Sequence, residues 1–378
     1  MKKVLFMLVA VCLGSAAEAK SDRSGWNAAF DLLRQTTTGT AQPTNTCLSP
    51  LSLQMALAMV NEGAAGKTRA QLGRLLPGNI DQLTTHLAAD ATLTSANSIW
   101  INHDFASAVH DSFAERNRQL YGAEIRVRHF GNQLPVEMND WCNEHTHGLI
   151  PGIIDHVDKQ DKMLLVNALY FRAEWCHQFE TRKTKEAPFH REDGASVQVP
   201  MMHETCSWEY AENNLCQCIV LPYACESEAS TRYSMYILLP RPELTLQGLL
   251  SHLDARWMKR LKLSRQRVQL QLPKWECSVS TDLAEPLKQM GITRPFTSDA
   301  EFTGISNAPL SISQILQKTR IRVDESGTEA AAVTMVGMLG AAPQKLKEPK
   351  QMIVNRPFIW VLVETESMTP VFVGTTTF

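Results

Sequence analysis

The sequence lacks the short motifs that mark several common catalytic sites. It contains no Gly-x-Ser-x-Gly, no His-Glu-x-x-His and no glycine-rich dinucleotide loop. Ser, His and Asp residues are scattered, and no spacing among them points to a catalytic triad. We therefore expect a protein that acts by binding a partner and not an enzyme, and we expect neither a cofactor nor a bound metal.

The sequence also lacks a strong net charge and a long apolar run. Its net charge is −2 and its pI is about 6.6, so there is no electrostatic reason to expect a nucleic acid or an anionic membrane as partner. The apolar run over residues 4–13 is too short for a transmembrane segment. No internal repeat or linker divides the later chain, so we expect a single domain over residues 20–378 and a monomer.

The N-terminal residues 1–19 are typical of a signal peptide. Two lysines precede the apolar run, and an Ala-x-Ala cleavage site ends at Ala19. The signal peptide resembles those of bacteria. The mature protein is expected to be exported, either secreted or periplasmic. Lipoprotein processing at Cys12, which would give a cell-surface protein, is the alternative. It is disfavoured because Val11 is bulky where a small residue is expected.

Cysteine is not scarce, but its arrangement is weakly informative. Eight cysteines follow Ala19, namely Cys47, Cys142, Cys176, Cys206, Cys216, Cys218, Cys225 and Cys277. Four of them are clustered in sequence, but a single Cys-x-Cys without a second pair is weak support for a metal site. A disulfide is compatible with export. We favour the third interpretation, small buried hydrophobic side chains on strands.

Hydrophobic periodicity predicts an α+β protein, with helices dominating early and strands later. Ser49-Pro50 opens a predicted helix over residues 48–60 as a cap followed by proline. Two more helices are predicted over residues 244–261 and 282–290. Strands are predicted over residues 95–101, 163–171, 197–202, 215–222, 233–239, 268–272, 352–354, 358–363 and 371–373.

One predicted strand carries a polar residue in an apolar run. Residues 163–171 are apolar apart from Asn167 in their interior, which is typical of a strand buried on both faces. We expect Asn167 to find hydrogen bonds, because an unsatisfied buried amide costs about 1–3 kcal/mol.

The segment from residue 315 to 343 changes character at Gly327. Before it, Thr319, Ile321 and Val323 alternate with Lys318, Arg320 and Arg322, which predicts a strand with one apolar face. After it, almost every residue is small or apolar until Pro343 and a lysine-rich run. By composition alone, this part is either a buried Ala/Met helix or an exposed segment.

From about Trp26 to Phe378 the chain resembles the serpins, through many short blocks in the family's order. Residues 167–175, Asn-Ala-Leu-Tyr-Phe-Arg-Ala-Glu-Trp, resemble the family's central strand. The most specific block is Glu325-x-Gly327-Thr328-Glu329-Ala330-Ala331-Ala332-Val333-Thr334. Other matching blocks are Ser49-Pro50-Leu51-Ser52, Tyr121-Gly122-Ala123-Glu124, Val199-Pro200-Met201-Met202, Leu221-Pro222-Tyr223, Pro273-Lys274-Trp275, Asn355-Arg356-Pro357-Phe358 and Phe372-Val373-Gly374.

The resemblance implies the serpin fold: three β-sheets, about eight or nine helices and an exposed reactive-centre loop, here within about residues 325–350. It also implies suicide inhibition of serine proteases, or in some members cysteine proteases. A protease cleaves the loop, which then inserts as a new strand into the central sheet and traps the acyl-enzyme. The alternative function is that of a non-inhibitory carrier or chaperone with the same fold.

The resemblance also assigns roles to residues. The hinge comprises Glu325, Gly327, Thr328, Glu329, Ala330, Ala331, Ala332, Val333 and Thr334. The gate of the sheet comprises Ser49, Ser52, Asn167, Trp175 and Gln317, with Gln317 where the family usually has histidine. The scissile bond is expected between Ala341 and Ala342, and the alternatives are Gly340, Leu339, Met338 and Lys345. Alanine before the cut favours elastase-like or subtilisin-like targets, whereas Lys345 would favour trypsin-like ones.

Overall fold

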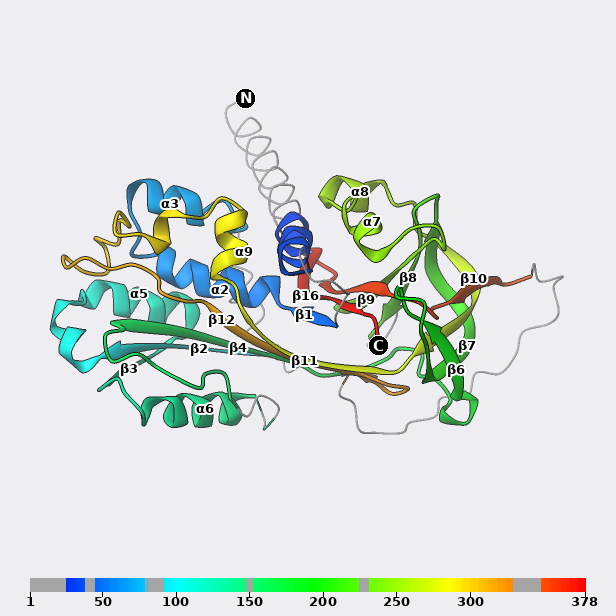
Figure 1. Cartoon of the computed structure of the whole chain (residues 1–378), viewed down its shortest axis with the longest axis horizontal. Helices are drawn as coiled ribbons and strands as arrows, with labels where there is room; N and C mark the ends of the chain where they lie inside the picture. Colours follow the sequence, from blue (N-terminus) through cyan, green and yellow to red (C-terminus); the bar gives the residue numbers. More distant parts are fainter. Residues whose placement is uncertain are drawn as a thin grey trace, which may run out of the picture.

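The computed structural model describes residues 25–37, 45–78, 80, 92–146, 148, 152–223, 231–328 and 348–378. Its helices and three sheets form the mixed α+β architecture expected from the sequence (Figure 1). In the described part, no helix is both long and apolar enough to span a membrane.

The largest sheet has nine strands and is built mainly from the later half of the chain. Its strands run in the order β1-β16-β15-β9-β8-β7-β10-β14, with β6 paired to β7. Among its described strand pairs, only β10 and β14 are parallel. The bounds are β1 Thr46–Leu48, β6 Lys185–His190, β7 Ser196–Glu212, β8 Cys216–Pro222, β9 Tyr233–Pro240, β10 Ser264–Pro273, β14 Lys350–Ile353, β15 Phe358–Glu364 and β16 Thr369–Thr376.

Two smaller sheets lie beside each other, with β12 next to β4 (Figure 1). The four-stranded sheet has the order β11-β12-β13-β5, and the three-stranded sheet has the order β3-β2-β4. The bounds are β11 Trp275–Asp282, β12 Leu316–Val323, β13 Gly327–Thr328, β5 Ala173–Glu174, β3 Glu124–Arg128, β2 Leu93–Asn102 and β4 Met163–Phe171.

Helices cover both faces of this strand layer. Residues 25–37 form the first described helix. The further helices are α2 Pro50–Asn61, α3 Gly66–Leu72, η1 His103–Ala108, α5 Asp111–Tyr121, α6 Leu134–His145, η2 Thr181–Lys183, α7 Leu246–Leu250, α8 Ala255–Arg260, α9 Ala284–Gln289 and η4 Arg294–Phe296. The predicted start of α2 is confirmed, because Ser49 Oγ accepts a hydrogen bond of 3.1 Å from Ser52 N.

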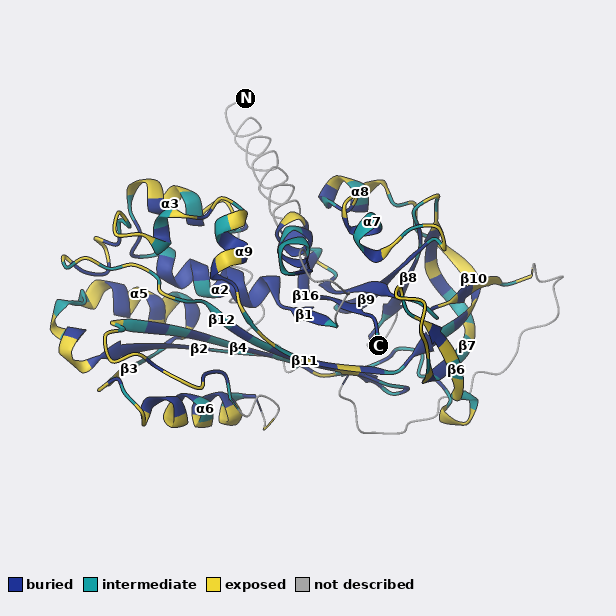
Figure 2. Ribbon diagram, in the orientation of Figure 1, coloured by how far each residue is buried: buried dark blue, intermediate teal, exposed yellow. Residues whose placement is uncertain are grey.

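Strand β4 separates two apolar cores, because successive strand residues point to opposite faces. Figure 2 shows buried residues in α2 and α6, which lie on either side of this strand. Leu169 and Phe171 pack into the main core, which includes α2. Val166 and Ala168 pack into a smaller core with Trp141 of α6. Helices α2 and α6 therefore cover opposite faces of the same strand.

The expectation that residues 163–171 are buried on both faces is wrong in part. Val166 and Ala168 are buried, but Met163, Leu165 and Asn167 are only half-buried. The reason is local, because Met163 and Leu165 line a cavity between β4 and the segment that leads into β12.

The single helix predicted over residues 244–261 is also wrong, because two short helices replace it. Thr245 caps α7 by accepting a hydrogen bond from Gly248 N, and Asp254 caps α8 by accepting one from Trp257 N. A side chain that caps a new helix competes with continuation of the preceding one, so Asp254 restarts the helix.

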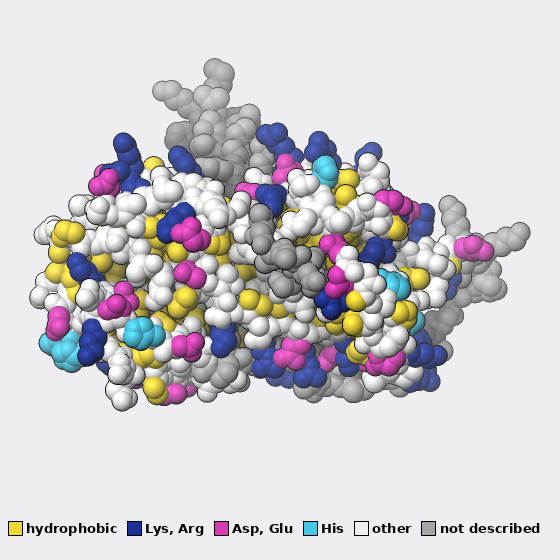
Figure 3. All heavy atoms as spheres, in the orientation of Figure 1, with side chains coloured by type: hydrophobic (Ala, Val, Ile, Leu, Met, Phe, Trp, Pro, Cys, Tyr) yellow, Lys and Arg dark blue, Asp and Glu magenta, His cyan; other side chains and the backbone are white. Residues whose placement is uncertain are grey.

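Charged side chains of both signs are interspersed on the face of the molecule shown in Figure 3. Among the described residues, opposite-charge pairs include Arg128 with Glu137 and Arg320 with Glu276. This face therefore carries no large area of one sign, as the small net charge suggests.

Candidate functional site

The two-residue strand β13 lies between the longer strands β12 and β5. Thr328 pairs with Val323 of β12 and with Ala173 of β5, and Gly327 pairs with Glu174. Both pairings are antiparallel. The beginning of the predicted hinge is therefore already a strand of the sheet, at one end of the boundary between β12 and the β4–β5 strand.

Gly327 allows the backbone of the hinge to approach β5 closely. A Cβ atom at this position would lie 2.1 Å from the carbonyl oxygen of Ala173. Such a distance is far below van der Waals contact, and the obstacle is backbone, which cannot rotate away. Glycine is thus required for the entry of β13 into the sheet.

An aromatic pair holds the hinge from one side. Trp175 stacks on Tyr223 with ring centroids 4.4 Å apart, and its Nε1 donates to the carbonyl oxygen of Asp324 at 2.9 Å. The hydroxyl of Tyr223 is 2.6 Å from that of Thr328, and both residues are buried. Burial raises the pKa of Tyr223 well above its ordinary value, so the phenol stays neutral.

Two side chains hold Glu325, the first residue of the predicted hinge. Lys274 Nζ lies 2.8 Å from one carboxylate oxygen, and Thr184 Oγ1 donates to the other at 2.8 Å. Burial alone would raise the pKa of Glu325, but the hydrogen bonds from Lys274 and Thr184 outweigh it and lower the pKa below 4.5. Its backbone carbonyl accepts a further bond from Phe179 N.

Gln317 joins β12 to the beginning of α2 by two reciprocal hydrogen bonds. Its Oε1 accepts from Ser49 N at 2.9 Å, and its Nε2 donates to Ser49 O at 2.8 Å. Ser49 Oγ donates in turn to Val371 O at 2.7 Å, while Thr319 Oγ1 donates to Cys47 O at 2.5 Å. One face of β12 is therefore held to α2, β1 and β16 by buried polar contacts.

The structure brings Ser49, Ser52 and Gln317 together but gives Asn167 and Trp175 other partners. Asn167 Nδ2 donates to Asn97 Oδ1 at 2.7 Å, and its Oδ1 has no hydrogen-bond partner among the described residues. Trp175 lies beside the beginning of the hinge, where its Nε1 donates to the carbonyl oxygen of Asp324. The predicted gate is thus two bonded groups on opposite sides of one boundary, plus a residue at the hinge.

That boundary between β4 and β12 is hereafter the seam. No ladder pairs the two strands in the described part of the chain. Residues 163–166 of β4 and residues 311–316 leading into β12 instead line opposite walls of a largely apolar cavity of about 80 Å³. The seam is therefore an unpaired boundary with a cavity in it. On their other edges, β12 is paired with β11 and β4 with β2.

The remaining predicted site residues lie outside the described residues. They are the hinge residues Glu329, Ala330, Ala331, Ala332, Val333 and Thr334, the scissile pair Ala341 and Ala342, and the alternatives Met338, Leu339, Gly340 and Lys345.

Several residues of the site were not assigned a role from the sequence. Tyr223, Asp324, Lys274 and Thr184 all contact the hinge, directly or through Trp175. Tyr223 is 105 residues from Thr328, and no local spacing can reveal such a contact. The only sequence signal was that Tyr223 and Lys274 stand in blocks that match the family.

Comparison with known proteins shows the family to which this chain belongs. A family model described as "Serpin (serine protease inhibitor)" matches residues 25–377. The chain belongs to the serpin family. It is 32% identical over 349 residues to an uncharacterised serpin-like protein of Thermococcus kodakarensis, with 87% of this chain and 80% of the relative covered. It is also 32% identical to Serpin-Z3 of Arabidopsis thaliana, covering 89% and 92% of the two chains.

Solved serpin structures share the fold over nearly the whole chain. The native state of tengpin, a thermophilic serpin, aligns with a TM-score of 0.82 at 28% identity, covering 94% of each chain. Human thyroxine-binding globulin complexed with thyroxine aligns with a TM-score of 0.84 at 24% identity, covering 96% of this chain and 99% of that chain.

Membership supports protease inhibition as the general function of this serpin, with proteases as the general class of partner. The thyroxine complex shows that the same fold also serves a protein that binds a small molecule. The hinge and the seam, and not the fold alone, must therefore carry the assignment of a mechanism.

Gln317→Ala should destabilise the serpin, because it leaves the buried N–H of Ser49 without its acceptor. We expect a loss of about 1–3 kcal/mol in the free energy of unfolding, measured by urea denaturation. Arg322→Ala is the matched control, since Arg322 is an exposed residue of the same strand. Equal losses in the two variants would contradict the role given to Gln317.

Glu325 should make stability depend on pH in the acid range. Its pKa is lowered in the fold, so its contribution is fully present above the ordinary glutamate value of 4.5 and is lost as pH falls through the lower, folded pKa. Glu325→Gln should therefore reduce the drop in melting temperature between neutral pH and pH below 4.5. Glu285→Gln, at an exposed surface pair, should leave the drop unchanged, and an unchanged drop in both variants would refute the assignment.

Proposed function

We propose that this serpin is a suicide inhibitor of serine proteases, and of cysteine proteases in a secondary role, that traps the acyl-enzyme by inserting its cleaved loop into the seam. The observation that carries the proposal is β13: two hinge residues already pair with β12 and β5 at one end of an unpaired seam. Further insertion needs only continuation of an existing strand.

Continuing the two observed registers gives each hinge residue defined neighbours. Ala330 would lie between Ile321 and Phe171, and Thr334 would lie between Gln317 and Asn167. The side chains of Thr328, Ala330, Ala332 and Thr334 would share the face that Gln317 and Thr319 turn toward the core. Small residues fit there with little displacement, and Thr334 would supply a hydroxyl beside the unpartnered Oδ1 of Asn167.

The outward face is matched in charge. By the same registers, Glu329 would lie between Arg172 and Arg322, both of which are exposed. A carboxylate between two guanidinium groups gains from both, and the group stays in water, so its desolvation cost is small. The alternation of small inward residues with a compatible outward charge therefore supports insertion.

The proposed loop, within about residues 325–350, would present the scissile bond between Ala341 and Ala342 and so suit elastase-like or subtilisin-like proteases. Trapping needs only a small displacement of the attacked ester, because catalytic geometry tolerates little error. We further propose that residues 1–19 are a signal peptide, that residues 20–378 are one exported domain, and that the protein acts as a monomer.

The test is to mix the full chain with elastase, subtilisin, trypsin and papain and to look for an adduct that survives SDS. We expect an adduct with elastase or subtilisin, because acyl-enzyme hydrolysis is blocked once the loop inserts. The released C-terminal peptide, identified by mass spectrometry, should begin at Ala342. A protein that each protease only cuts or ignores would be a non-inhibitory serpin, such as a carrier or chaperone.

Thr328→Arg separates insertion from simple recognition of the loop. Thr328 is buried against Tyr223, and a charge there has no described partner and is costly to bury. We expect the variant to be cleaved at the same bond without adduct. Ala331→Glu is the control, since continued alternation turns residue 331 outward beside Arg320. Adduct formation by Thr328→Arg at the wild-type level would contradict the insertion mechanism.

A further inference from the structure

Two histidines lie side by side at the far end of the three-stranded sheet. The parallel pairing of β2 with β3 ends with Asn102 opposite Arg128, so the next residue of each segment is a histidine. The rings of His103 and His129 have centroids 4.2 Å apart with their planes inclined by 35°. Both side chains are exposed, so their nitrogen atoms are accessible from solvent.

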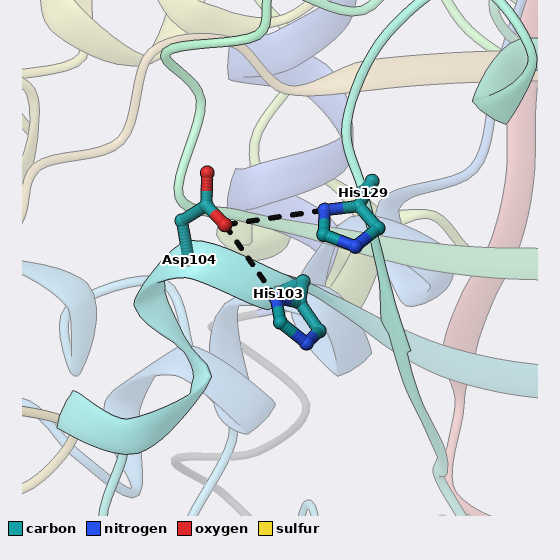
Figure 4. A group of neighbouring side chains, drawn as sticks. All are labelled: His103, Asp104 and His129. Atoms are coloured by element: carbon teal, nitrogen blue, oxygen red, sulfur yellow. Dashed lines mark hydrogen bonds and ion pairs between the residues drawn. The ribbon is translucent and has the colours of Figure 1, made fainter.

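A carboxylate completes the group. Asp104 Oδ1 lies 3.5 Å from Nδ1 of His103 and 3.9 Å from Nδ1 of His129 (Figure 4). The candidate ligand atoms of the three residues all lie within 4.8 Å of one another. A tetrahedral ion with bonds near 2.0–2.1 Å holds its ligand atoms roughly 3.3 Å apart, so small rotations of exposed side chains would suffice.

The backbone beneath these side chains is fixed at several points. Asn102 is buried, and its Nδ2 donates to the carbonyl oxygens of Lys159 and Asp161 at 3.1 and 3.0 Å. Its Oδ1 accepts from Asp104 N at 3.3 Å. Phe105 follows the first pair of ligands and Phe130 follows His129, and both aromatic rings are buried. Because the backbone is already fixed, binding an ion would cost only the rotamer freedom of the three side chains.

The nearby charges do not oppose a cation here. Arg128 precedes His129, but its Nε bonds both carboxylate oxygens of Glu137 at 2.9 Å. Within the described residues, the carboxylate of Asp104 has only the two imidazoles as ionic neighbours. It is therefore available to neutralise part of an ion's charge.

We propose that His103, Asp104 and His129 form a surface site for a divalent transition metal of the zinc class. Two imidazole nitrogens and one carboxylate suit Zn²⁺, whereas Ca²⁺ and Mg²⁺ prefer sets made of oxygen atoms. The side chains are between 62% and 83% exposed, which leaves the remaining coordination positions to water. The site ties the end of β2 to the end of β3 and is separate from the hinge and the seam.

The test is equilibrium dialysis of the full, reduced chain against ZnCl₂, comparing wild type with His103→Ala and His129→Ala. We expect each variant to bind one Zn²⁺ fewer, or to bind that equivalent at least about tenfold more weakly, because even outer partners of a metal's ligands contribute about 10- to 100-fold in affinity. Asp104→Asn should also weaken binding. Circular dichroism without metal should be unchanged in every variant, since the replaced side chains are exposed.

His252→Ala is the matched control, because His252 is exposed and lies on another segment, between α7 and α8. It should bind zinc as wild type does. Co²⁺ spectra distinguish this site from binding to cysteine. The difference between the visible spectra of Co²⁺-loaded wild type and Co²⁺-loaded His103→Ala should show nitrogen and oxygen ligands and no thiolate charge-transfer band. Equal zinc binding by wild type and both histidine variants, or a thiolate spectrum for that equivalent, would overturn the proposal.

Discussion

The rest of the structure depends on a seam that is left unpaired between two otherwise well-bonded strands. β12 pairs with β11 along its full length, and β4 pairs with β2 in the same way. Between β4 and β12 there is no described ladder, and the walls enclose a cavity. Backbone groups along a seam are a template for a new strand, and β13 already lies at one end of this seam.

Two sets of contacts fix the strands on either side of the seam without pairing them to each other. At one end, Trp175 bonds Asp324, Tyr223 bonds Thr328 and Lys274 bonds Glu325. Along β12, Gln317 and Thr319 bind the strand to α2 and β1. These contacts fix the walls but do not join them. Under the proposed insertion mechanism, the uninserted fold persists because of a kinetic barrier and not because it is the most stable arrangement.

The sequence predicts much of this where the signal is local. The cap at Ser49, the strand over residues 163–171 and the alternation that ends at Val323 are all present in the fold. Local signals fail where a tertiary contact decides. Asp254 restarts a helix that periodicity alone would continue, and the cavity beside Leu165 leaves half-buried part of a strand that its composition would bury.

In the candidate site, the sequence nominates individual residues but not the contacts between them. The resemblance nominates Glu325, Gly327 and Thr328, but only the structure shows that Lys274, Thr184 and Tyr223 hold them. The resemblance also places Trp175 in the gate, and the structure adds that its indole Nε1 donates to the carbonyl oxygen of Asp324, the residue before Glu325. Contacts between residues more than a hundred positions apart leave no periodic trace, so physical reasoning from one sequence cannot supply them.

The most direct test of the central claim is the melting temperature before and after a single cut within residues 329–347. The cut can be made with a protease that the protein does not trap. If the loop is free to enter the seam, it adds backbone hydrogen bonds on two sides, and the cleaved protein should melt well above the intact one. A cleaved protein that melts at the same temperature or lower would contradict the account, because the seam would then accept no strand.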